Sequence, residues 1–283
     1  MKKCNRTEHS EYKKHLVCYE KDHHTNIHNE ENMKILITND DGIQASGIHR
    51  LAKALHPEHD VYMYAPSDEK SGVGHSFTFL QPLRVVPVSR EYKAYAINGT
   101  PVDCVKLGMY HMGETPDFIV SGINRGANLG TDVLYSGTAS AAMEGVLLGV
   151  PSLAVSCAGT TEPMHYETAA HFAKKALRYM MENPLPPFTM LNLNVPDKPL
   201  EEVKGLRACR LGFRNYSNGY KRCTDPRGNE YYWLDDEDNP SPDETCDIEW
   251  SARGYATVSP VSPDMTAYLY LDAMRQHPLN GFK

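Results

Sequence analysis

Short apolar runs alternate with segments of helical periodicity from Met33 onward, and this alternation limits the possible folds more than any other feature. The run MKILIT at 33–38 is typical of a strand buried on both faces of a parallel sheet. Residues 47–55 then place apolar side chains at helical spacing, and DVYMYA at 60–65 is a second apolar run. Strand, helix and strand in this order form a βαβ unit, which makes a right-handed crossover. The pattern predicts an α/β fold with a doubly wound, mostly parallel sheet.

The same rhythm continues through most of the chain. A helix is expected to begin at Thr100, with Pro101 at its first position. Further helices are predicted at 139–148, 167–182 and 265–274, and further strands at 83–88, 92–97, 117–121, 152–156, 189–195 and 255–258. The strands at 83–88 and 92–97 are expected to form a hairpin-like pair.

Three regions of different texture divide the chain. Residues 1–32 are polar and without periodicity, which predicts a disordered extension. Residues 33–196 form the predicted α/β core with the functional site. Residues 197–283 are strand-rich and hold many aromatic residues among Pro, Gly and Asp, which predicts an arm of hairpins and a final helix that packs on another subunit as an oligomerisation element.

Composition narrows the class of protein. A length of 283 residues fits one large α/β domain or one domain with an appendage. The net charge of −7 argues against a general nucleic-acid binder, so no nucleic-acid polymer is expected as a partner. The seven cysteines are odd in number and lack a C-x-x-C spacing, which argues against a disulfide framework and a zinc ribbon. No apolar stretch is long enough to span a membrane, and we expect a cytoplasmic protein.

Three polar loops each follow a predicted buried strand. They are 39–42 (NDDG), 68–74 (DEKSGVG) and 122–138 (GINRGANLGTDVLYSGT). In open parallel sheets, ligands bind outside the carboxyl ends of the strands. We therefore expect these loops to converge there and to form one site.

Adjacent carboxylates at Asp40 and Asp41 indicate a cation. Like charges side by side repel unless water or a cation relieves the repulsion, and hard divalent ions prefer oxygen ligands. Ser71 and Asn124 supply oxygen atoms from the other two loops. A solvated turn is the simpler interpretation of an Asp-Asp-Gly sequence, but the position at a strand end beside two polar loops favours a metal site.

The third loop has the composition of an anion site. Its glycines allow close backbone approach, Asn124 and Asn128 supply amides, and Ser136, Gly137 and Thr138 precede an apolar helix as an N-cap would. Free N–H groups at a helix start suit a phosphate. An ordinary capped helix with a glycine turn explains the same residues equally well. No Walker motif and no G-x-S-x-G elbow is present, so neither a P-loop nor a serine esterase is indicated.

With these motifs in view, the sequence resembles the SurE family, stationary-phase survival proteins that act as metal-dependent 5′/3′-nucleotidases. The matching stretches lie within residues 33–261 and read ILITNDDGIQASGI, YAPSDEKSGVGHSFT, INGTPVDCVKLG, PDFIVSGINRGANLGTDVLYSGTASAAMEGVLLGVPSLAVS, LNLNVP and DPRGNEYYW. Residues 1–32 have no counterpart in the family pattern. Gly74 stands where many members carry serine.

The resemblance implies a Rossmann-like core and a homodimer or homotetramer that exchanges C-terminal elements. It implies hydrolysis of nucleoside 5′- and 3′-monophosphates with one divalent metal ion, Mg²⁺ or Mn²⁺. The implied metal ligands are Asp40, Asp41, Ser71 and Asn124, and the implied phosphate-binding residues are Asn39, Asn128, Ser136, Gly137 and Thr138. We expect Asp40 and Asn128 to be catalytic, with Asp40 either attacking phosphorus or activating water.

Other functions fit the same loops. A broader phosphatase that also acts on short polyphosphate would share the site and differ in substrate. A non-catalytic nucleotide- or metal-binding module would bind without turnover, and a purely interacting stress protein would do neither.

Overall fold

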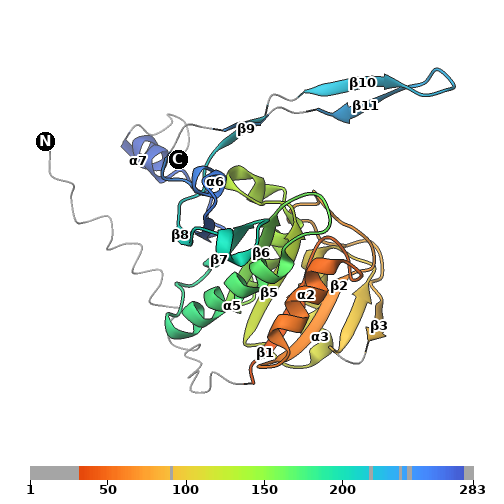
Figure 1. Cartoon of the computed structure of the whole chain (residues 1–283), viewed down its shortest axis with the longest axis vertical. Coiled ribbons are helices and arrows are strands. Elements are labelled where there is room, and N and C mark those ends of the chain that lie inside the picture. Colours follow the sequence, from red (N-terminus) through yellow and green to blue (C-terminus); the bar gives the residue numbers. More distant parts are fainter. Residues whose placement is uncertain (1–31, 90–91, 217–218, 236–237, 241–243, 277–283) are drawn as a thin grey trace, which may run out of the picture.

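A nine-stranded mixed sheet forms the centre of the protein, seen here in a computed structural model (Figure 1). The structure describes residues 32–89, 92–216, 219–235, 238–240 and 244–276. The strand order is β3-β4-β2-β1-β5-β6-β7-β13-β8. The strands are β1 (Lys34–Thr38), β2 (Asp60–Pro66), β3 (Val85–Ser89), β4 (Ala94–Ile97), β5 (Phe118–Arg125), β6 (Ser152–Ala158), β7 (Met190–Pro196), β8 (Leu206–Ala208) and β13 (Ala256–Val261).

Helices cover both faces of the sheet. Helices α2 (Ser46–Leu55) and α5 (Tyr166–Glu182) pack together on one face, and α3 (Pro101–Met112) and α4 (Gly137–Leu147) pack together on the other. Strand β1 shows the consequence for its residues: Ile35 and Ile37 belong to the core under α2 and α5, whereas Leu36 belongs to the core under α3. Burial on both faces explains why this strand reads as a continuous apolar run.

The chain reverses its direction of travel across the sheet between β1 and β5. From β1 it adds β2 and then β4 on one side, and from β5 it adds β6 and β7 on the other, all six in parallel. Strands β1 and β5 are neighbours, with Thr38, the last residue of β1, paired to Ser121 in β5. Such a reversal opens a crevice outside the carboxyl ends of the two strands, where ligands bind in open α/β sheets.

Local sequence signals set the helix starts. Thr100 caps α3 in a capping box, in which its side chain accepts from Asp103 N while the Asp103 carboxylate accepts from Thr100 N. Pro101 occupies the first helical position, and Gly113 ends the helix with a φ of 71°. The expected helix at 100 is thereby confirmed.

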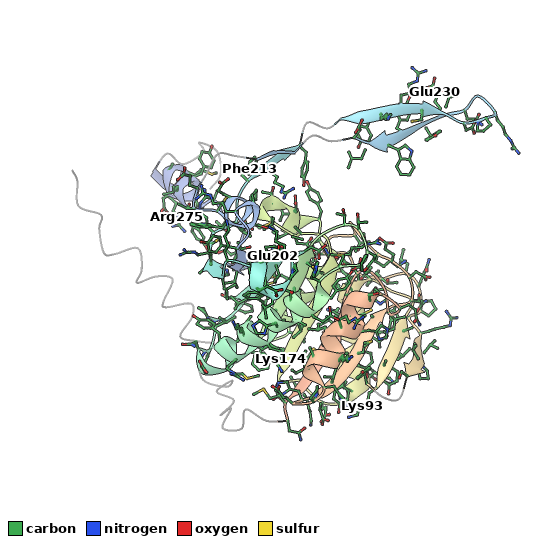
Figure 2. All side chains as sticks on the ribbon, viewed as in Figure 1. Lys93, Lys174, Glu202, Phe213, Glu230 and Arg275 are labelled. Atoms are coloured by element: carbon green, nitrogen blue, oxygen red, sulfur yellow. The ribbon has the colours of Figure 1, made fainter. Side chains whose placement is uncertain are left out.

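The segment after β7 both completes the sheet and leaves it. Strand β13 pairs antiparallel with β7, and β8 pairs parallel with β13. In the sequence, two further strand pairs lie between β8 and β13. Strand β9 (Arg214–Tyr216) pairs with β12 (Asp238–Pro240), and β10 (Tyr220–Thr224) pairs with β11 (Glu230–Leu234). Helices α6 (Asp247–Ala252) and α7 (Tyr268–Gln276) and the short 3₁₀ turn η2 (Leu200–Glu202) complete this part. The β10–β11 hairpin extends away from the α/β body, and Glu230 marks it in Figure 2.

The α/β fold class predicted from the sequence is confirmed. The pair β3–β4 is antiparallel, as expected for the hairpin-like segment. Two expectations were wrong in detail. The loop predicted from residue 122 begins later, because β5 continues to Arg125 after an irregularity between Ser121 and Asn124. The segment 197–283, expected to hold hairpins and a final helix, also holds the shorter helix α6.

The predicted division of the chain at residue 196 stays a prediction. Strands β8 and β13 come after this residue and belong to the main sheet. The predicted N-terminal extension lies outside the described residues except for Asn32. Within the described ranges, no helix combines the length and the apolar character that crossing a bilayer requires.

Gly47 in α2 gives a test of this packing. A Cβ at this position would overlap the carbonyl oxygen of Ile123 in β5, which backbone geometry holds in place. We expect Gly47→Ala to lower the free energy of unfolding by about 3 kcal/mol, measured by urea denaturation. Lys53→Ala on the exposed side of the same helix is the control, with a change within about 0.5 kcal/mol. Equal stability of the two variants would contradict the close contact between α2 and β5.

Candidate active site

Asp40 lies in the turn after β1 and packs against the first turn of α4. Its side chain is buried, with 4% exposed, and its Oδ1 accepts a hydrogen bond from the Thr138 hydroxyl. An added Cβ on Gly137 would lie 2.8 Å from Asp40 Cβ, so only glycine allows this approach. The structure therefore brings together the first polar loop and the predicted phosphate loop.

The two neighbouring carboxyls are both harder to ionise than ordinary ones. Burial raises the pKa of Asp40, opposed by hydrogen bonds from the Thr138 hydroxyl and from the backbone at the start of α4. Burial also raises the pKa of Asp41 to about 6, and the negative charge of Asp40 adds to the effect. A backbone hydrogen bond from Arg125 opposes it. A cation at this point would favour the charged form of both groups.

The second loop reaches the site through backbone contacts. We call residues 67–78 the Ser71 loop. Lys70, the residue before Ser71, donates its backbone N–H to Asp40 O at 2.7 Å. The Ser71 hydroxyl itself is exposed and donates to Glu69 Oε1 at 2.9 Å. The structure therefore brings this loop to the Asp40 turn and directs the Ser71 hydroxyl to its own loop.

The end of β5 delivers Asn124. Arg125 N donates to Asp41 Oδ2 at 3.0 Å, which joins this strand end to the Asp41 carboxylate. The Asn124 side chain is 8% exposed, and its Nδ2 donates to Gly126 O at 2.9 Å. The predicted ligands Ser71 and Asn124 are therefore each next to a residue whose backbone N–H bonds the acidic pair: Lys70 bonds Asp40, and Arg125 bonds Asp41.

Asn128 is held by a group of buried side chains from β6 and β7. Its backbone N donates to Asn194 Oδ1 at 2.7 Å, and its backbone O accepts from Asn192 Nδ2 and Asn194 Nδ2 at 2.8 and 3.0 Å. Its side-chain Nδ2 donates to Ser156 Oγ at 2.8 Å. The position of Asn128 is thereby fixed by three neighbours, and its amide is directed to Ser156.

Helix α4 starts as the sequence predicts. Ser136 is the N-cap, with its Oγ accepting from Ala139 N at 3.0 Å. The 3₁₀ turn η1 (Gly130–Leu134) leads into it, and Gly137 and Thr138 form the first helical residues. The amino end of this eleven-residue helix points its free N–H groups at the Asp40 turn, the geometry of an anion site.

The oxygen chemistry of the site fits a hard divalent cation. The described residues hold no group of three or more His, Cys, Asp and Glu side chains placed for a metal. What converges instead is two carboxylates with hydroxyl and amide neighbours. Two buried polar atoms near the Asp40 turn have no hydrogen-bond partner in the described part of the chain: Asn39 Oδ1 after β1 and Ser121 Oγ in β5. Buried polar atoms without partners are uncommon, and others in the described residues, such as His59 Nδ1 and Ser259 Oγ, lie in other parts of the fold.

Asn39, predicted to bind phosphate, lies beneath the acidic pair. Its Nδ2 donates to Gly42 O at 3.0 Å, so its amide group braces the turn that carries Asp40 and Asp41. The side chain is fully buried.

Sequence reasoning missed several residues that build the site. Asn192 and Asn194 were visible as alternating asparagines in LNLNVP, a polar pattern on an otherwise buried strand. Asp247 is 1% exposed and accepts from Gly130 N at 2.8 Å and Gly212 N at 2.7 Å, which ties α6 to η1. Glu144, buried in α4, binds His75 and Lys106. A single histidine such as His75 gives no sign of its role in the sequence, because its partner Glu144 lies 69 residues away.

Comparison with known proteins gives one consistent result. The family model "Survival protein SurE" matches residues 35–218. A curated relative named "5'-nucleotidase SurE" from Synechococcus sp. (strain JA-3-3Ab) is 45% identical over 258 residues, covering 88% of this chain and 99% of the relative. Another of the same name from Vibrio cholerae is 42% identical and covers 86% of this chain. The crystal structure of the SurE protein from Aquifex aeolicus matches with a TM-score of 0.76 and 37% identity, covering 86% of this chain and 99% of that one.

Asn194 provides a test of the support for Asn128. Asn194→Ala would leave the Asn128 N–H buried without its acceptor, so we expect the free energy of unfolding to fall by about 2 kcal/mol in urea denaturation. The matched control is Asn183→Ala, since Asn183 also bonds a backbone carbonyl at 3.0 Å but is exposed. The control is expected to change stability by less than about 0.5 kcal/mol. If Asn194→Ala were as stable as the control, Asn128 would not depend on β7.

Proposed function

The chain belongs to the SurE family, and on that premise we propose that it is a divalent-metal-dependent nucleotidase that hydrolyses nucleoside 5′- and 3′-monophosphates to nucleoside and phosphate. The curated relatives carry the name 5'-nucleotidase. The observation that carries the proposal is the packing of Asp40, with Asp41 beside it, against the amino end of α4. An acidic pair for a cation and a helix start for a phosphate lie at one point.

Four side chains are proposed to hold one Mg²⁺ or Mn²⁺ ion: Asp40, Asp41, Ser71 and Asn124. When bound, the cation would neutralise charge on the phosphoryl oxygens and acidify a water molecule. As a metal ligand, the Ser71 hydroxyl would give up its hydrogen bond to Glu69. The raised pKa values of Asp40 and Asp41 agree with a site that gains stability from a cation.

The phosphate is proposed to lie against the start of α4. Ser136, Gly137 and Thr138 would present backbone N–H groups to its oxygens, because the first N–H groups of a helix have no partner inside the helix. Asn128 would add an amide donor from the loop before η1, released from Ser156. Asn39 would act from below by bracing the acidic turn.

Asp40 is proposed as the reactive carboxylate. It either attacks phosphorus or takes a proton from the attacking water, and both roles require its ionised form. Thr138 donates to its Oδ1 and therefore favours that form while fixing the carboxylate next to the phosphate loop. Asp41, held by Arg125 N, is left to anchor the cation.

We further propose that the chain forms a homodimer or homotetramer through its C-terminal arm. The β10–β11 hairpin exposes Tyr231, Tyr232, Trp233 and Leu234, each at least 44% exposed, which is apolar area that a second copy would cover. The proposed cytoplasmic location rests on the reduced thiols. The five cysteines in the described ranges are all free.

One assay tests the proposed function against its alternatives. Purified full-length protein is given a panel of 5′- and 3′-mononucleotides and short polyphosphate, with Mg²⁺, with Mn²⁺ and with EDTA, and phosphate release is measured. We expect release from mononucleotides with a divalent ion and none with EDTA. Release from polyphosphate as well would extend the substrate class to a broader phosphatase. Nucleotide binding without any release would identify a non-catalytic module, and release that survives EDTA would refute the metal site.

Asp40→Asn tests the reactive carboxylate. Asparagine keeps the shape of the side chain and removes its charge, so we expect kcat to fall by about 10²- to 10⁴-fold with an unchanged circular dichroism spectrum. Asp60→Asn is the matched control, expected to keep wild-type kcat. Asp60 begins β2 and is paired with Lys34, at the amino ends of the parallel strands and away from the site. Wild-type turnover in Asp40→Asn would show that another group does the chemistry.

A further inference from the structure

Helix α4 carries a buried carboxylate for which the proposed mechanism has no use. Glu144 is 7% exposed, its Oε2 lies 2.9 Å from His75 Nε2, and its Oε1 accepts from Lys106 Nζ at 2.7 Å. The hydrogen bond with His75 lowers the pKa of Glu144 more than any other contact, and Lys106 adds to this effect. A buried carboxylate is costly unless it is paired and hydrogen-bonded. We call these three residues the Glu144 network.

The network joins three separate parts of the fold. Glu144 lies two turns into α4, Lys106 lies in α3, and His75 lies in the Ser71 loop. His75 thus attaches the Ser71 loop to α4, close to Ser71. Farther along the loop, Thr78 N and its hydroxyl donate to Asp103 in α3, and Ser76 O accepts from the Thr100 hydroxyl. Glu144 is buried and bonds Lys106 with its other carboxylate oxygen, so its position is fixed. Its hydrogen bond with His75 Nε2 therefore fixes the His75 ring.

The Ser71 loop is attached at points on either side of Ser71. Before it, Lys70 N donates to Asp40 O at 2.7 Å. After it, Gly74 N donates to Tyr135 O at 2.9 Å, and His75 contacts Glu144. Ser71 and Gly72 between these points are exposed, and a Cβ added to Gly72 would meet no atom within 4 Å. The path of the backbone through Ser71 is therefore set by its two flanking attachments.

We propose that His75 is a positioning residue that, through Glu144 and Lys106, fixes the Ser71 loop over the acidic pair and so sets the affinity of the chain for its divalent cation. The inference rests on the proposed function, in which Ser71 is a metal ligand. Gly74 N also donates to Tyr135 O, next to the N-cap Ser136. The same part of the loop therefore links the proposed metal ligand Ser71 to the proposed phosphate-binding start of α4. Removing a side chain that orients a metal ligand through hydrogen bonds typically weakens metal binding by 10- to 100-fold.

The test measures Mn²⁺ binding to the full chain by calorimetry, without nucleotide. We expect His75→Ala to raise the dissociation constant for Mn²⁺ about tenfold, equal to about 1.4 kcal/mol. His75→Gln is expected to recover most of the affinity, because a glutamine amide N–H can reach the place of His75 Nε2 and donate to Glu144. His56→Ala, which removes a histidine at the far end of α2, is the control with unchanged binding.

Amide hydrogen exchange supplies a second readout that does not need metal. In His75→Ala, the amides of residues 70–76 are expected to exchange at least about tenfold faster, while the strands of the sheet keep their protection.

The outcomes separate this inference from the proposed function. If the unmodified chain binds no Mn²⁺, the metal site is wrong and this inference is overturned with it. If the unmodified chain binds Mn²⁺ and His75→Ala binds it equally tightly with unchanged exchange, only the positioning role is overturned. A folded His75→Ala protein with weaker binding, faster loop exchange and recovery in His75→Gln supports it.

Discussion

Parallel backbone pairing between β1 and β5 is the contact on which the rest of the structure depends. These two strands are far apart in sequence, and the chain builds outward from them in opposite directions. The turn after β1 and the last residue of β5 meet where the strand order reverses, and Arg125 N donates to Asp41 Oδ2 there. The Asp40 turn and Asn124 are delivered there by the strands themselves, and helix α4 follows β5 closely enough for its amino end to lie against Asp40. Placing charged groups on strand ends, and not on long loops, gives them the rigidity of the sheet.

Much of the fold could be predicted because its strands are buried on both faces and its helices on one. The run around Ile35–Ile37 and the spacing of Ile48, Leu51 and Leu55 carry that information locally. The convergence of three loops followed from the general rule for open parallel sheets, and the contacts of Asp40 with Lys70 and Thr138 agree with it. Local signals also sufficed for the caps at Thr100 and Ser136.

The supporting residues could not be predicted because their meaning depends on partners far away in the chain. Asn194 bonds Asn128, 66 residues earlier, and Asp247 bonds Gly130, 117 residues earlier. A buried asparagine on a strand or an aspartate before a short helix gives no sign of which backbone group it will meet. His75 illustrates the same limit: a lone histidine in a glycine-rich loop has no assignable role until α4 places Glu144 beside it. The sequence therefore identifies the polar residues at the strand ends, whereas the residues that fix their positions are known only from the tertiary contacts.

The position of β8 has a consequence for the order in which the chain assembles. Strand β8 precedes β13 in the sequence but lies outside it in the sheet and pairs with no other strand there. It has no edge to join until β13, some 50 residues later in synthesis, has paired with β7. Closing that long intervening segment is a slow, non-local step. A nascent chain that has emerged only as far as β7 therefore exposes β7 as an open sheet edge, and that edge is sealed only when almost the whole polypeptide has left the ribosome.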